Sequence, residues 1–557
     1  MSFLSKNHFK FFFAGWFLVN IIQAFFTELF HDEAYYWVYS QFFDWGYYDH
    51  PPMIAWMIKL GYAIFPNELG VRLLSIILNT VTILIIYDLT NKKNPFLFYA
   101  IALSIAVAHL GGMITVPDIP LIFFTALWFW VYRRFTDNDS WFNTFLLALS
   151  AALLMYSKYH GILVILFTVL SNIKLAATGK MYVAGLIGLL LFAPHLYWQW
   201  EHDFPSVQYH LYERNAPVYK FSFTTEYILG QLALMGPLLG WLFLWMNFKY
   251  KSQNLTEKAL QFSVWGFLIF FLFSSLKGRV EANWTLPALV GLMVISYQYI
   301  DSHRQYVKWV YRLLPVTLLL VLFARIILIV EIPFAGKVAK HNEFHNNPEW
   351  VSEVNSIARG EHVVFINSYQ SPSKFWFYNQ QLSYSLNTLN YRRNNYNFWT
   401  IEDSLIGKPA YVFGSNKEAP FAGALQEKPD MGHYYTTDYF SFGRVQILLG
   451  RAPVVRDSII SVSGLFRSPQ GYLFHFKNPK YKDAKILLGL KDETGKLSVV
   501  SNGYTVEHIE YSEQYFVISF ELPNDLPKGK YFARLGIESA IEHHPSLNST
   551  GYTIEIK

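Results

Sequence analysis

The chain contains no cysteine among its 557 residues, so disulfide bonds, thiolate nucleophiles and cysteine metal ligands are excluded. Charged residues are also scarce. They make up 15% of the chain, against roughly 25% in an average soluble protein. The net charge of +5 is too small to indicate a nucleic acid or another polyanion as a partner.

The chain is rich instead in apolar and aromatic side chains. Hydrophobic residues account for 53% and aromatic residues for 19% of the sequence, which excludes a disordered chain or a coiled coil. Residues 1–333 hold only 22 of the 45 basic and 18 of the 40 acidic residues, and the long apolar runs stop near Pro333. We therefore expect a membrane region followed by a large aqueous region.

Apolar runs approach the roughly 20 residues that a bilayer span needs. Two of them, 142–157 and 160–175, are short, and we interpret them as two spans joined by a tight turn. The sequence thus predicts an α-helical polytopic membrane protein with about eleven spans. The candidate runs are 11–30, 71–90, 95–115, 119–135, 142–157, 160–175, 181–199, 225–248, 259–276, 284–300 and 313–332.

The distribution of basic residues orients these spans. With the N-terminus in the cytoplasm, the inner segments carry fourteen Lys and Arg residues and the outer loops up to residue 333 carry seven. Acidic residues show the reverse bias, with five inside and thirteen outside. By the positive-inside rule the tail 334–557 then lies outside the membrane, in the periplasm if the cell is Gram-negative.

The outer loops hold the polar residues that could carry chemistry. The first loop opens with HDEAYYW (31–37) and continues through WGYYDHPPMIAW (45–56). Its stretches 33–45 and 53–65 favour two helices that lie in the membrane interface and hold Asp32 and Glu33 at its surface. Four further sites lie at outer span ends: Asp118 in TVPDIPL (115–121), Lys158 and His160 in SKYHG (157–161), the loop 198–214, and Lys277, Arg279, Glu281 and Asn283 in LKGRVEANWTLPA (276–288).

Each of these residues also has a simpler interpretation. Acids at span ends are often solvated caps, Lys158 and Arg279 could snorkel to the surface, and the aromatic residues could form an ordinary interface belt. The gathering of acids and bases on one face favours a site. Arg325 within the last span is a further candidate because intramembrane arginines are commonly functional. The pair of histidines in HNEFH (341–345) only weakly indicates a metal site.

Such a face suits the transfer of a sugar from a membrane-embedded lipid phosphate to a hydroxyl. The acceptor hydroxyl needs a carboxylate base, which Asp32 or Asp118 could supply. The phosphate leaving group needs cations that stabilise its developing charge. The basic residues able to do so are His50, Lys158, Lys277 and Arg279.

The motifs HDEAYYW, YYDHPPMIAW, VPDIPL, SKYHG, EHDFPSVQYHL and VEANWTLPA follow one another over residues 28–290. With them the chain resembles the C-type (GT-C) membrane glycosyltransferases. It is similar to the bacterial branch that contains lipid A aminoarabinose transferase and protein O-mannosyltransferases. The resemblance implies a multi-pass enzyme of the bacterial inner membrane. Its donor would be a polyprenyl-phosphate sugar, its acceptor a lipid, glycan or protein, and membrane lipids would surround it.

The resemblance also implies residue roles. Asp32 would be the catalytic carboxylate with Glu33 its neighbour, Asp118 the second acid, and Lys158 and Arg279 contacts of the donor phosphate or sugar. Some members bind a divalent metal, which Asp32, Asp118 and a nearby histidine could hold. Where the aminoarabinose transferases carry a lysine before the paired prolines this chain has His50, which is only partly charged near neutral pH. Aminoarabinose is therefore not implied as the sugar.

The tail divides into two expected domains after a membrane domain of residues 1–335. Residues 336–452 favour a small α/β domain, with a helix at 350–358 and buried strands at 362–368 and 410–416. Residues 453–557 favour a β-sandwich with strands at 472–477, 484–492, 515–523 and 530–538.

Two other functions stay open: a transporter or flippase of lipid-linked sugar, and a non-catalytic membrane assembly protein whose β-sandwich is the working part.

Overall fold

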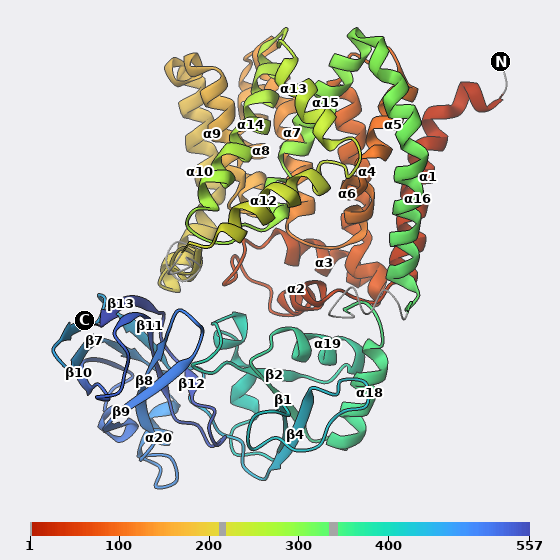
Figure 1. The fold of residues 1–557 in the computed structure, drawn as a ribbon. Coiled ribbons are helices and arrows are strands. Elements are labelled where there is room, and N and C mark those ends of the chain that lie inside the picture. The colour runs from red at the N-terminus through yellow and green to blue at the C-terminus, as the bar shows by residue number, and fades with distance from the viewer. Residues whose placement is uncertain (1–2, 211–218, 333–342, 470, 557) are drawn as a thin grey trace. The chain divides into compact units, whose positions relative to one another are not determined.

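The computed structural model describes residues 3–210, 219–332, 343–469 and 471–556. Contacts divide the chain into two compact units. The first comprises Met1–Asp203 and Tyr219–His345, and the second comprises Phe204–Val218 and Asn346–Lys557. Figure 1 labels the helices and strands of both units.

The first unit is helical (Figure 1). Each of the eleven apolar runs falls largely in helix, although 95–115, 160–175, 225–248 and 284–300 are each interrupted. The elements are α1 (Phe3–Phe26), α2 (His31–Gln41), α3 (Met53–Ile64), α4 (Glu68–Leu89), α5 (Pro95–Ser104), α6 (Ala106–Leu110), η1 (Gly111–Met113), α7 (Asp118–Asp137), α8 (Trp141–Ser157), α9 (Gly161–Ser171), α10 (Gly179–Glu201), α12 (Phe221–Leu234), α13 (Gly240–Lys249), α14 (Leu255–Ser274), η4 (Ala282–Thr285), α15 (Ala288–Ser302) and α16 (Val307–Ile329).

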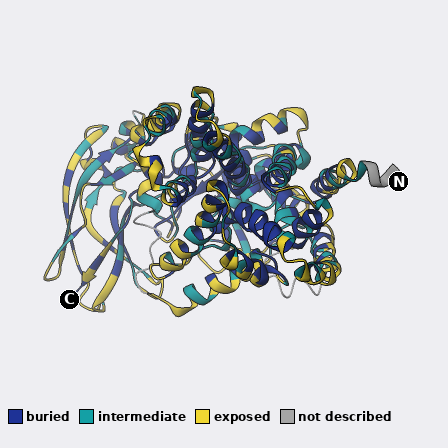
Figure 2. Cartoon of the chain, turned by 90° about the horizontal axis from the view of Figure 1, so that it is seen from above, coloured by how far each residue is buried: buried dark blue, intermediate teal, exposed yellow. Residues whose placement is uncertain are grey.

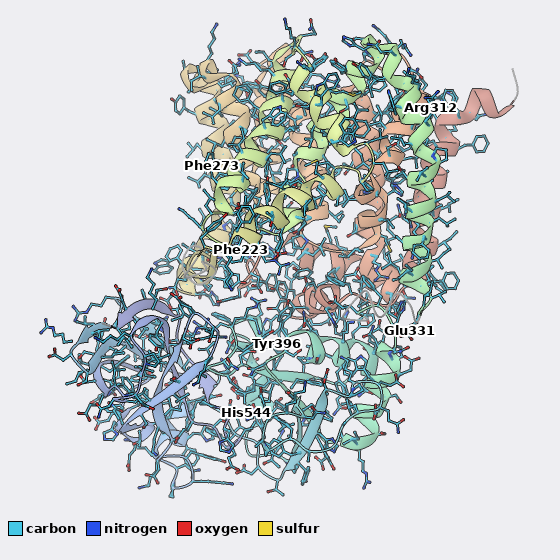
Figure 3. All side chains as sticks on the ribbon, viewed as in Figure 1. Phe223, Phe273, Arg312, Glu331, Tyr396 and His544 are labelled. Carbon is cyan, nitrogen blue, oxygen red and sulfur yellow. The ribbon has the colours of Figure 1, made fainter. Side chains whose placement is uncertain are left out.

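Five described helices are long and apolar enough to cross a membrane, and a sixth crossing results if the bent pair α5 and α6 counts as one. Exposed positions occur along these helices (Figure 2). Phe273 of α14, for example, is a large apolar side chain that is 65% exposed (Figure 3). Such side chains suit a lipid environment. The unit is therefore a multi-pass membrane region, and the full number of eleven spans stays a prediction.

The two helices expected in the first loop are present as α2 and α3, and their place in the membrane interface stays a prediction. Helix α2 begins at His31, two residues before the expected start. The reason is a local cap: the backbone N–H of Phe30 donates to Oε2 of Glu33 at 2.9 Å. A glutamate at the third position of a helix can accept a hydrogen bond from the backbone N–H group that precedes the helix. This N–H group would otherwise have no hydrogen-bond partner within the helix.

The second unit begins with a four-stranded sheet in the order β2-β1-β3-β4. Strands β1, β2 and β3 run parallel, and β4 pairs antiparallel with β3. The helix and the two strands expected for the α/β region are all present. The elements are α18 (Asn347–Ala358), β1 (His362–Ile366), α19 (Gln370–Asn379), β2 (Ser383–Leu386), η7 (Thr400–Ser404), β3 (Ala410–Ser415) and β4 (Met431–Thr436). The short helix α11 (Pro205–Gln208) also belongs to this unit.

Two further sheets share one apolar core and form the expected β-sandwich. One has the order β10-β7-β5 with β6 beside β7, and the other has the order β12-β11-β8-β9 with β13 beside β11. Because β5 precedes residue 452 and pairs with β7 beyond it, this sheet joins the two expected domains. The strands are β5 (Gln446–Leu449), β6 (Val454–Arg456), β7 (Ile459–Arg467), β8 (Lys485–Lys491), β9 (Leu497–Thr505), β10 (Glu513–Glu521), β11 (Gly529–Ile537), β12 (Ser546–Leu547) and β13 (Tyr552–Ile556).

One expected strand is wrong. Residues 472–477 form the helix α20 (Tyr472–Lys477). Its two buried side chains, Tyr472 and Phe476, are four residues apart, which places them on one helical face. The alternating aromatic pattern of YLFHFK therefore reflects one turn of helix laid against the core.

Candidate active site

Asp118 is the centre of a buried polar cluster in the first unit. It opens α7 directly after Pro117, a position where the helix N-terminus favours a carboxylate. Its side chain is enclosed, with 2% of the residue exposed. Nζ of Lys158 donates to its Oδ1 at 2.8 Å and to its Oδ2 at 3.0 Å. Nδ2 of Asn283 donates to Oδ2 at 2.9 Å. The motifs TVPDIPL, SKYHG and LKGRVEANWTLPA thus meet at one carboxylate.

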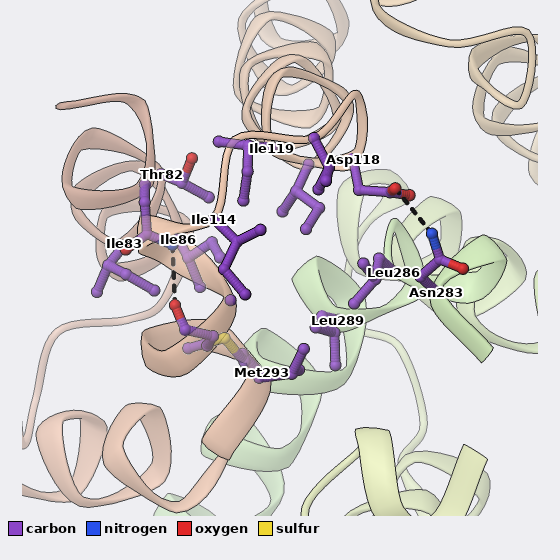
Figure 4. A pocket seen from close by; sticks show the side chains of 16 residues that line it. Thr82, Ile83, Ile86, Ile114, Asp118, Ile119, Asn283, Leu286, Leu289 and Met293 are labelled. Carbon is purple, nitrogen blue, oxygen red and sulfur yellow. Dashed lines mark hydrogen bonds between the residues drawn. The ribbon is translucent and has the colours of Figure 1, made fainter. Parts of the chain in front are cut away.

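A cavity of about 180 Å³ opens beside this cluster (Figure 4). Its walls are formed by α4, the α6–η1 segment, α7 and α15, and most of its lining is aliphatic. Asp118 and Asn283 supply polar groups to its lining, as do Asn79 and Thr82 of α4. The cavity therefore has an aliphatic part that suits an apolar chain and a polar part that suits a polar head group. Its aliphatic lining is Ile83, Ile86, Val107, Ile114, Val116, Ile119, Ile122, Leu286, Leu289 and Met293, with Ala108 and Gly111.

Glu33 lies in a second polar cluster and is completely buried. Its Oε1 accepts from Nε of Arg72 at 2.8 Å and from the backbone N–H of Thr115 at 2.8 Å. Its Oε2 accepts from Nη2 of Arg72 at 2.6 Å and from the backbone of Phe30. Four donors thus occupy this carboxylate, which ties α2 to α4 and to the segment that leads into Asp118.

Arg72 uses its remaining donors on the end of α1. Nη1 donates to the carbonyl oxygens of Ala24 and Thr27, at 3.1 and 2.5 Å, and Nη2 donates to that of Glu28 at 2.8 Å. The last carbonyl groups of a helix lack intrahelical partners and attract a cation. The guanidinium therefore joins the end of α1 to the start of α2.

Asp32 is half-buried in the first turn of α2, between His31 and Glu33. The hydrogen bonds of Glu33 therefore determine where the Asp32 backbone lies. His31 lies 3.9 Å from a carboxylate oxygen of Glu343. Because Glu33 also binds Thr115, three residues before Asp118, one buried side chain connects the segments that carry Asp32 and Asp118.

The two expected histidines pack against aromatic rings. His160, which precedes α9, lies 5.3 Å from the ring of Phe271 and 5.3 Å from that of Trp284, the neighbour of Asn283. It is therefore close to the Asp118 cluster. His50 lies edge-on to Tyr36 of α2, with 5.6 Å between ring centres.

The remaining expected ligands lie at the surface of the unit. Lys277 and Arg279 are exposed. Nε of Arg279 lies 3.5 Å from Oε2 of Glu226 and 3.9 Å from Oε1 of Glu281. Exposed ion pairs of this kind contribute little to stability. Among the described contacts, none links Lys277, Arg279 or Glu281 to Asp118.

Sequence reasoning missed three polar residues that organise this region. Arg72 and Asn79 stand inside an apolar run, where a single polar residue is the signal that could have identified them. Asp49, in the motif YYDHPP, is buried. Its Oδ2 accepts from the hydroxyl groups of Tyr35 at 3.2 Å and Tyr39 at 3.4 Å. These contacts hold the second half of the first loop against α2.

Arg325 has neutral partners in the structure. Its Nη2 donates to Oδ1 of Asn20 at 2.8 Å and to the carbonyl oxygen of His109 at 2.7 Å, and Nη1 lies 3.4 Å from Oε1 of Gln23. The His109 carbonyl lies in the bent α5–α6 pair, where irregular backbone within a membrane needs partners. Arg325 therefore joins α16 to α1 and to the bent segment.

The described residues contain no group of three or more histidine and acidic side chains able to hold a metal ion. Of the HNEFH motif, His341 lies outside the described residues, and Nε2 of His345 lies 2.8 Å from the Ile327 carbonyl oxygen. Within the described parts of the chain, the divalent metal that the resemblance allows therefore has no ligand set.

Comparisons with known proteins agree with this architecture. Residues 49–198 match the family described as dolichyl-phosphate-mannose-protein mannosyltransferase. A 301-residue alignment covering 51% of the chain is 23% identical to the lipid A galacturonosyltransferase RgtD of Rhizobium johnstonii. The alignment spans 62% of that relative's length.

Two solved structures of ArnT from Cupriavidus metallidurans are similar in fold. The apo structure is 13% identical with a TM-score of 0.54, and the structure bound to undecaprenyl phosphate is 12% identical with a TM-score of 0.57. Each similarity covers 77% of this chain and 98% of the ArnT chain. The chain therefore has an ArnT-like fold, as its sequence motifs indicated.

Proposed function

We propose that the protein is an integral membrane glycosyltransferase. It moves a hexosyl or pentosyl group from a polyprenyl-phosphate donor to a hydroxyl or phosphate of a lipid, glycan or protein. The observation that carries this proposal is the Asp118–Lys158–Asn283 cluster at an apolar cavity. A prenyl phosphate has the same two characters, an apolar chain and an anionic head. The match to the dolichyl-phosphate-mannose-protein mannosyltransferase family and the similarity to a lipid A galacturonosyltransferase support it.

The cluster suits a donor phosphate at Lys158. An ammonium group has three N–H donors, and Asp118 receives two of them. The third would donate to a phosphate oxygen and stabilise the charge that develops as the phosphate leaves. Asp118 acts here as the residue that positions the ammonium group of Lys158, since its own oxygens already accept three hydrogen bonds.

Asp32 is the proposed base. Its carboxylate takes the proton from an acceptor hydroxyl, and the oxygen attacks the anomeric carbon. The bond from that carbon to the phosphate oxygen breaks, and prenyl phosphate departs with the bonding electrons. A single displacement inverts the anomeric centre. Glu33, with four donors on its carboxylate, is a positioning residue that holds Asp32 in place.

The other expected ligands take supporting roles in this proposal. His160 and Asn283 lie in or beside the cluster and would contact the donor sugar. His50, Lys277, Arg279 and Glu281 would line the approach from the outer face. That assignment places the N-terminus in the cytoplasm and the second unit outside the membrane, as the distribution of basic residues favours.

The test is donor turnover by purified protein in nanodiscs. We would supply a pool of labelled polyprenyl-phosphate sugars and measure release of free polyprenyl phosphate. Wild type should release it, and Asp32→Asn should lower the rate by about 10²-fold or more, the range associated with loss of a general base. Glu68→Gln, a half-exposed acid of the same outer loop, is the matched control and should keep the wild-type rate.

Equal rates for wild type and Asp32→Asn would remove Asp32 from the chemistry. Absence of release from every donor, with acceptor lipids also supplied, would favour a transporter or an assembly protein. Product with a retained anomeric configuration would contradict the single displacement.

A further inference from the structure

Helix α12 buries few of its side chains. Of its fourteen residues, all of which the structure describes, only Tyr227 and Gln231 are buried. Large apolar side chains of the same helix, such as Phe221 and Leu229, are exposed. The hydroxyl group of Tyr227 donates to the carbonyl oxygen of Leu268 at 2.7 Å, which attaches α12 to α14. The other buried side chain is an amide, and its contacts lead elsewhere.

The amide of Gln231 holds both ends of the short helix η4. Its Nε2 donates to the carbonyl oxygen of Ala282 at 3.3 Å, and its Oε1 accepts from the hydroxyl group of Thr285. These two residues begin and end η4. An aliphatic side chain would fill the same space, whereas a buried amide is favourable only when it is hydrogen-bonded. The two hydrogen bonds therefore fix η4 against α12.

The backbones of α12 and η4 also approach each other closely. A Cβ atom at Gly230, the residue before Gln231, would lie 3.2 Å from the Cβ atom of Ala282, so glycine allows this approach. At the start of the same segment, Oγ1 of Thr224 lies 2.9 Å from Oγ of Ser275. The segment that leads to η4 is thus attached to α12 at more than one point.

Asn283 lies between the two attachment points of η4. Its Nδ2 donates to Oδ2 of Asp118 at 2.9 Å (Figure 4). Its carbonyl oxygen accepts from the backbone N–H of Leu286 at 3.1 Å, which limits the freedom of its backbone. Asp118 in turn accepts two hydrogen bonds from Lys158. A continuous series of contacts therefore leads from Gln231 through η4 to the ammonium group.

We propose that Gln231 is a positioning residue of the donor site. Through η4 it sets the amide of Asn283 on Asp118, and Asp118 then directs the ammonium group of Lys158 toward the donor phosphate. Donors that stabilise developing charge act best when their positions are fixed before the reaction. This inference deepens the proposed function and rests on it, because the phosphate at Lys158 is part of that proposal.

The test is a kinetic cycle with the purified full chain in nanodiscs. Release of polyprenyl phosphate is measured over a series of concentrations of the labelled polyprenyl-phosphate sugars. Gln231→Met keeps the length of the side chain and removes both hydrogen bonds. It should lower kcat about tenfold, the effect of a lost hydrogen bond to a charged group. KM should change less than about twofold, because the contact strengthens as the phosphate leaves.

The double variant separates positioning from general stabilisation. Asn283→Ala should lower kcat at least as much as Gln231→Met. Gln231→Met combined with Asn283→Ala should lose no more than Asn283→Ala alone, because Gln231 acts through Asn283. Equal thermal unfolding midpoints identify the variants that fold.

Tyr227→Phe is the matched control on the same helix. It removes the hydrogen bond from α12 to Leu268, leaves those to η4 in place, and should keep the wild-type kcat. Thr285→Val removes the hydroxyl group that donates to Gln231 and should lower kcat as Gln231→Met does. Thr285→Ser retains that hydroxyl group and should keep the wild-type kcat.

Binding of undecaprenyl phosphate in detergent, measured by native mass spectrometry, reports the same contact without turnover. The free lipid carries the charge that the leaving group develops, so Gln231→Met and Asn283→Ala should each weaken its binding about tenfold. The double variant should bind it no more weakly than Asn283→Ala. If wild type binds this lipid but releases it from no donor, the proposed transfer fails and the binding data still decide the role of Gln231.

An unchanged kcat and an unchanged affinity in folded Gln231→Met would overturn the proposal. Additive losses from Gln231→Met and Asn283→Ala would do the same, and so would an equal loss in Tyr227→Phe, which would make α12 an anchor without a specific role at Asn283. Failure of wild type to bind undecaprenyl phosphate would remove the donor site together with its positioning residue.

Discussion

Glu402 is a carboxylic acid enclosed in the second unit, on η7. Its Oε1 accepts from the hydroxyl groups of Tyr439, at 3.2 Å, and Ser441, and Oε2 accepts from that of Tyr472 at 3.3 Å. Burial raises its pKa from 4.5 to about 7, although these hydrogen bonds and the charge of Arg444 oppose the shift.

The stability of the second unit should therefore depend on pH. Between pH 4.5 and about 7 the folded state holds a proton on Glu402 that the unfolded chain has released, so stability falls as the pH rises. The full effect is ~3 kcal/mol, since one pKa unit corresponds to 1.36 kcal/mol. Above pH 7 this contribution should level off.

Thermal unfolding midpoints measured from pH 4.5 to 8 test this dependence. Glu402→Gln should flatten the fall of the midpoint, whereas Glu521→Gln, an exposed acid on β10, should retain it. The other groups that face Glu402 are Tyr384 and the Arg444–Asp403 ion pair. A slope that persists in Glu402→Gln would assign the titration elsewhere.

At the scale of elements, Glu33 and Arg72 join α1, α2 and α4, and Glu33 also binds Thr115 just before α7. Both side chains of this ion pair are fully buried. Removing one partner of a buried pair leaves an uncompensated charge, which costs about 3–5 kcal/mol.

We expect Glu33→Gln and Arg72→Met each to lower the free energy of unfolding by about that amount. The double variant should lose less than the sum, because the second change removes the charge that the first left alone. Unfolding by titration with a denaturing detergent measures all three. Additive losses would show that the two side chains act independently.

The bent pair α5 and α6 shows that an apolar run does not determine whether its helix is straight or bent. Residues 95–115 are mostly apolar and predict a single span, but the two helices meet at 86°. Asn79 donates to the Ala108 carbonyl oxygen at 2.8 Å and Arg325 donates to that of His109. The bend therefore depends on hydrogen-bond donors from α4 and α16. The sequence of residues 95–115 does not include these donors.

At the scale of the whole molecule, the orientation in the membrane is a prediction from the distribution of charged residues. The absence of cysteine makes it directly testable, because single cysteines can be introduced without background. Ser458→Cys lies in the second unit and Ser302→Cys at the end of α15, and both residues are exposed.

A membrane-impermeant maleimide should label Ser458→Cys in spheroplasts and should label Ser302→Cys only after lysis. Unlabelled wild type is the control. The reverse pattern would place the second unit in the cytoplasm and would contradict the proposed site on the outer face.

The sequence by itself determined the membrane region, the helices α2 and α3, and the motifs that carry Asp32, Asp118, Lys158 and Asn283. Hydropathy, charge bias and motif order are local properties, so they can be read without a fold. Only the tertiary structure decided which of these side chains meet. Asp118 contacts Lys158 and Asn283, which lie 40 and 165 residues away, and Glu33 is neutralised by Arg72 at a distance of 39 residues. Such pairs depend on how helices pack, because a charge buried in a low-dielectric interior needs a partner that only packing supplies.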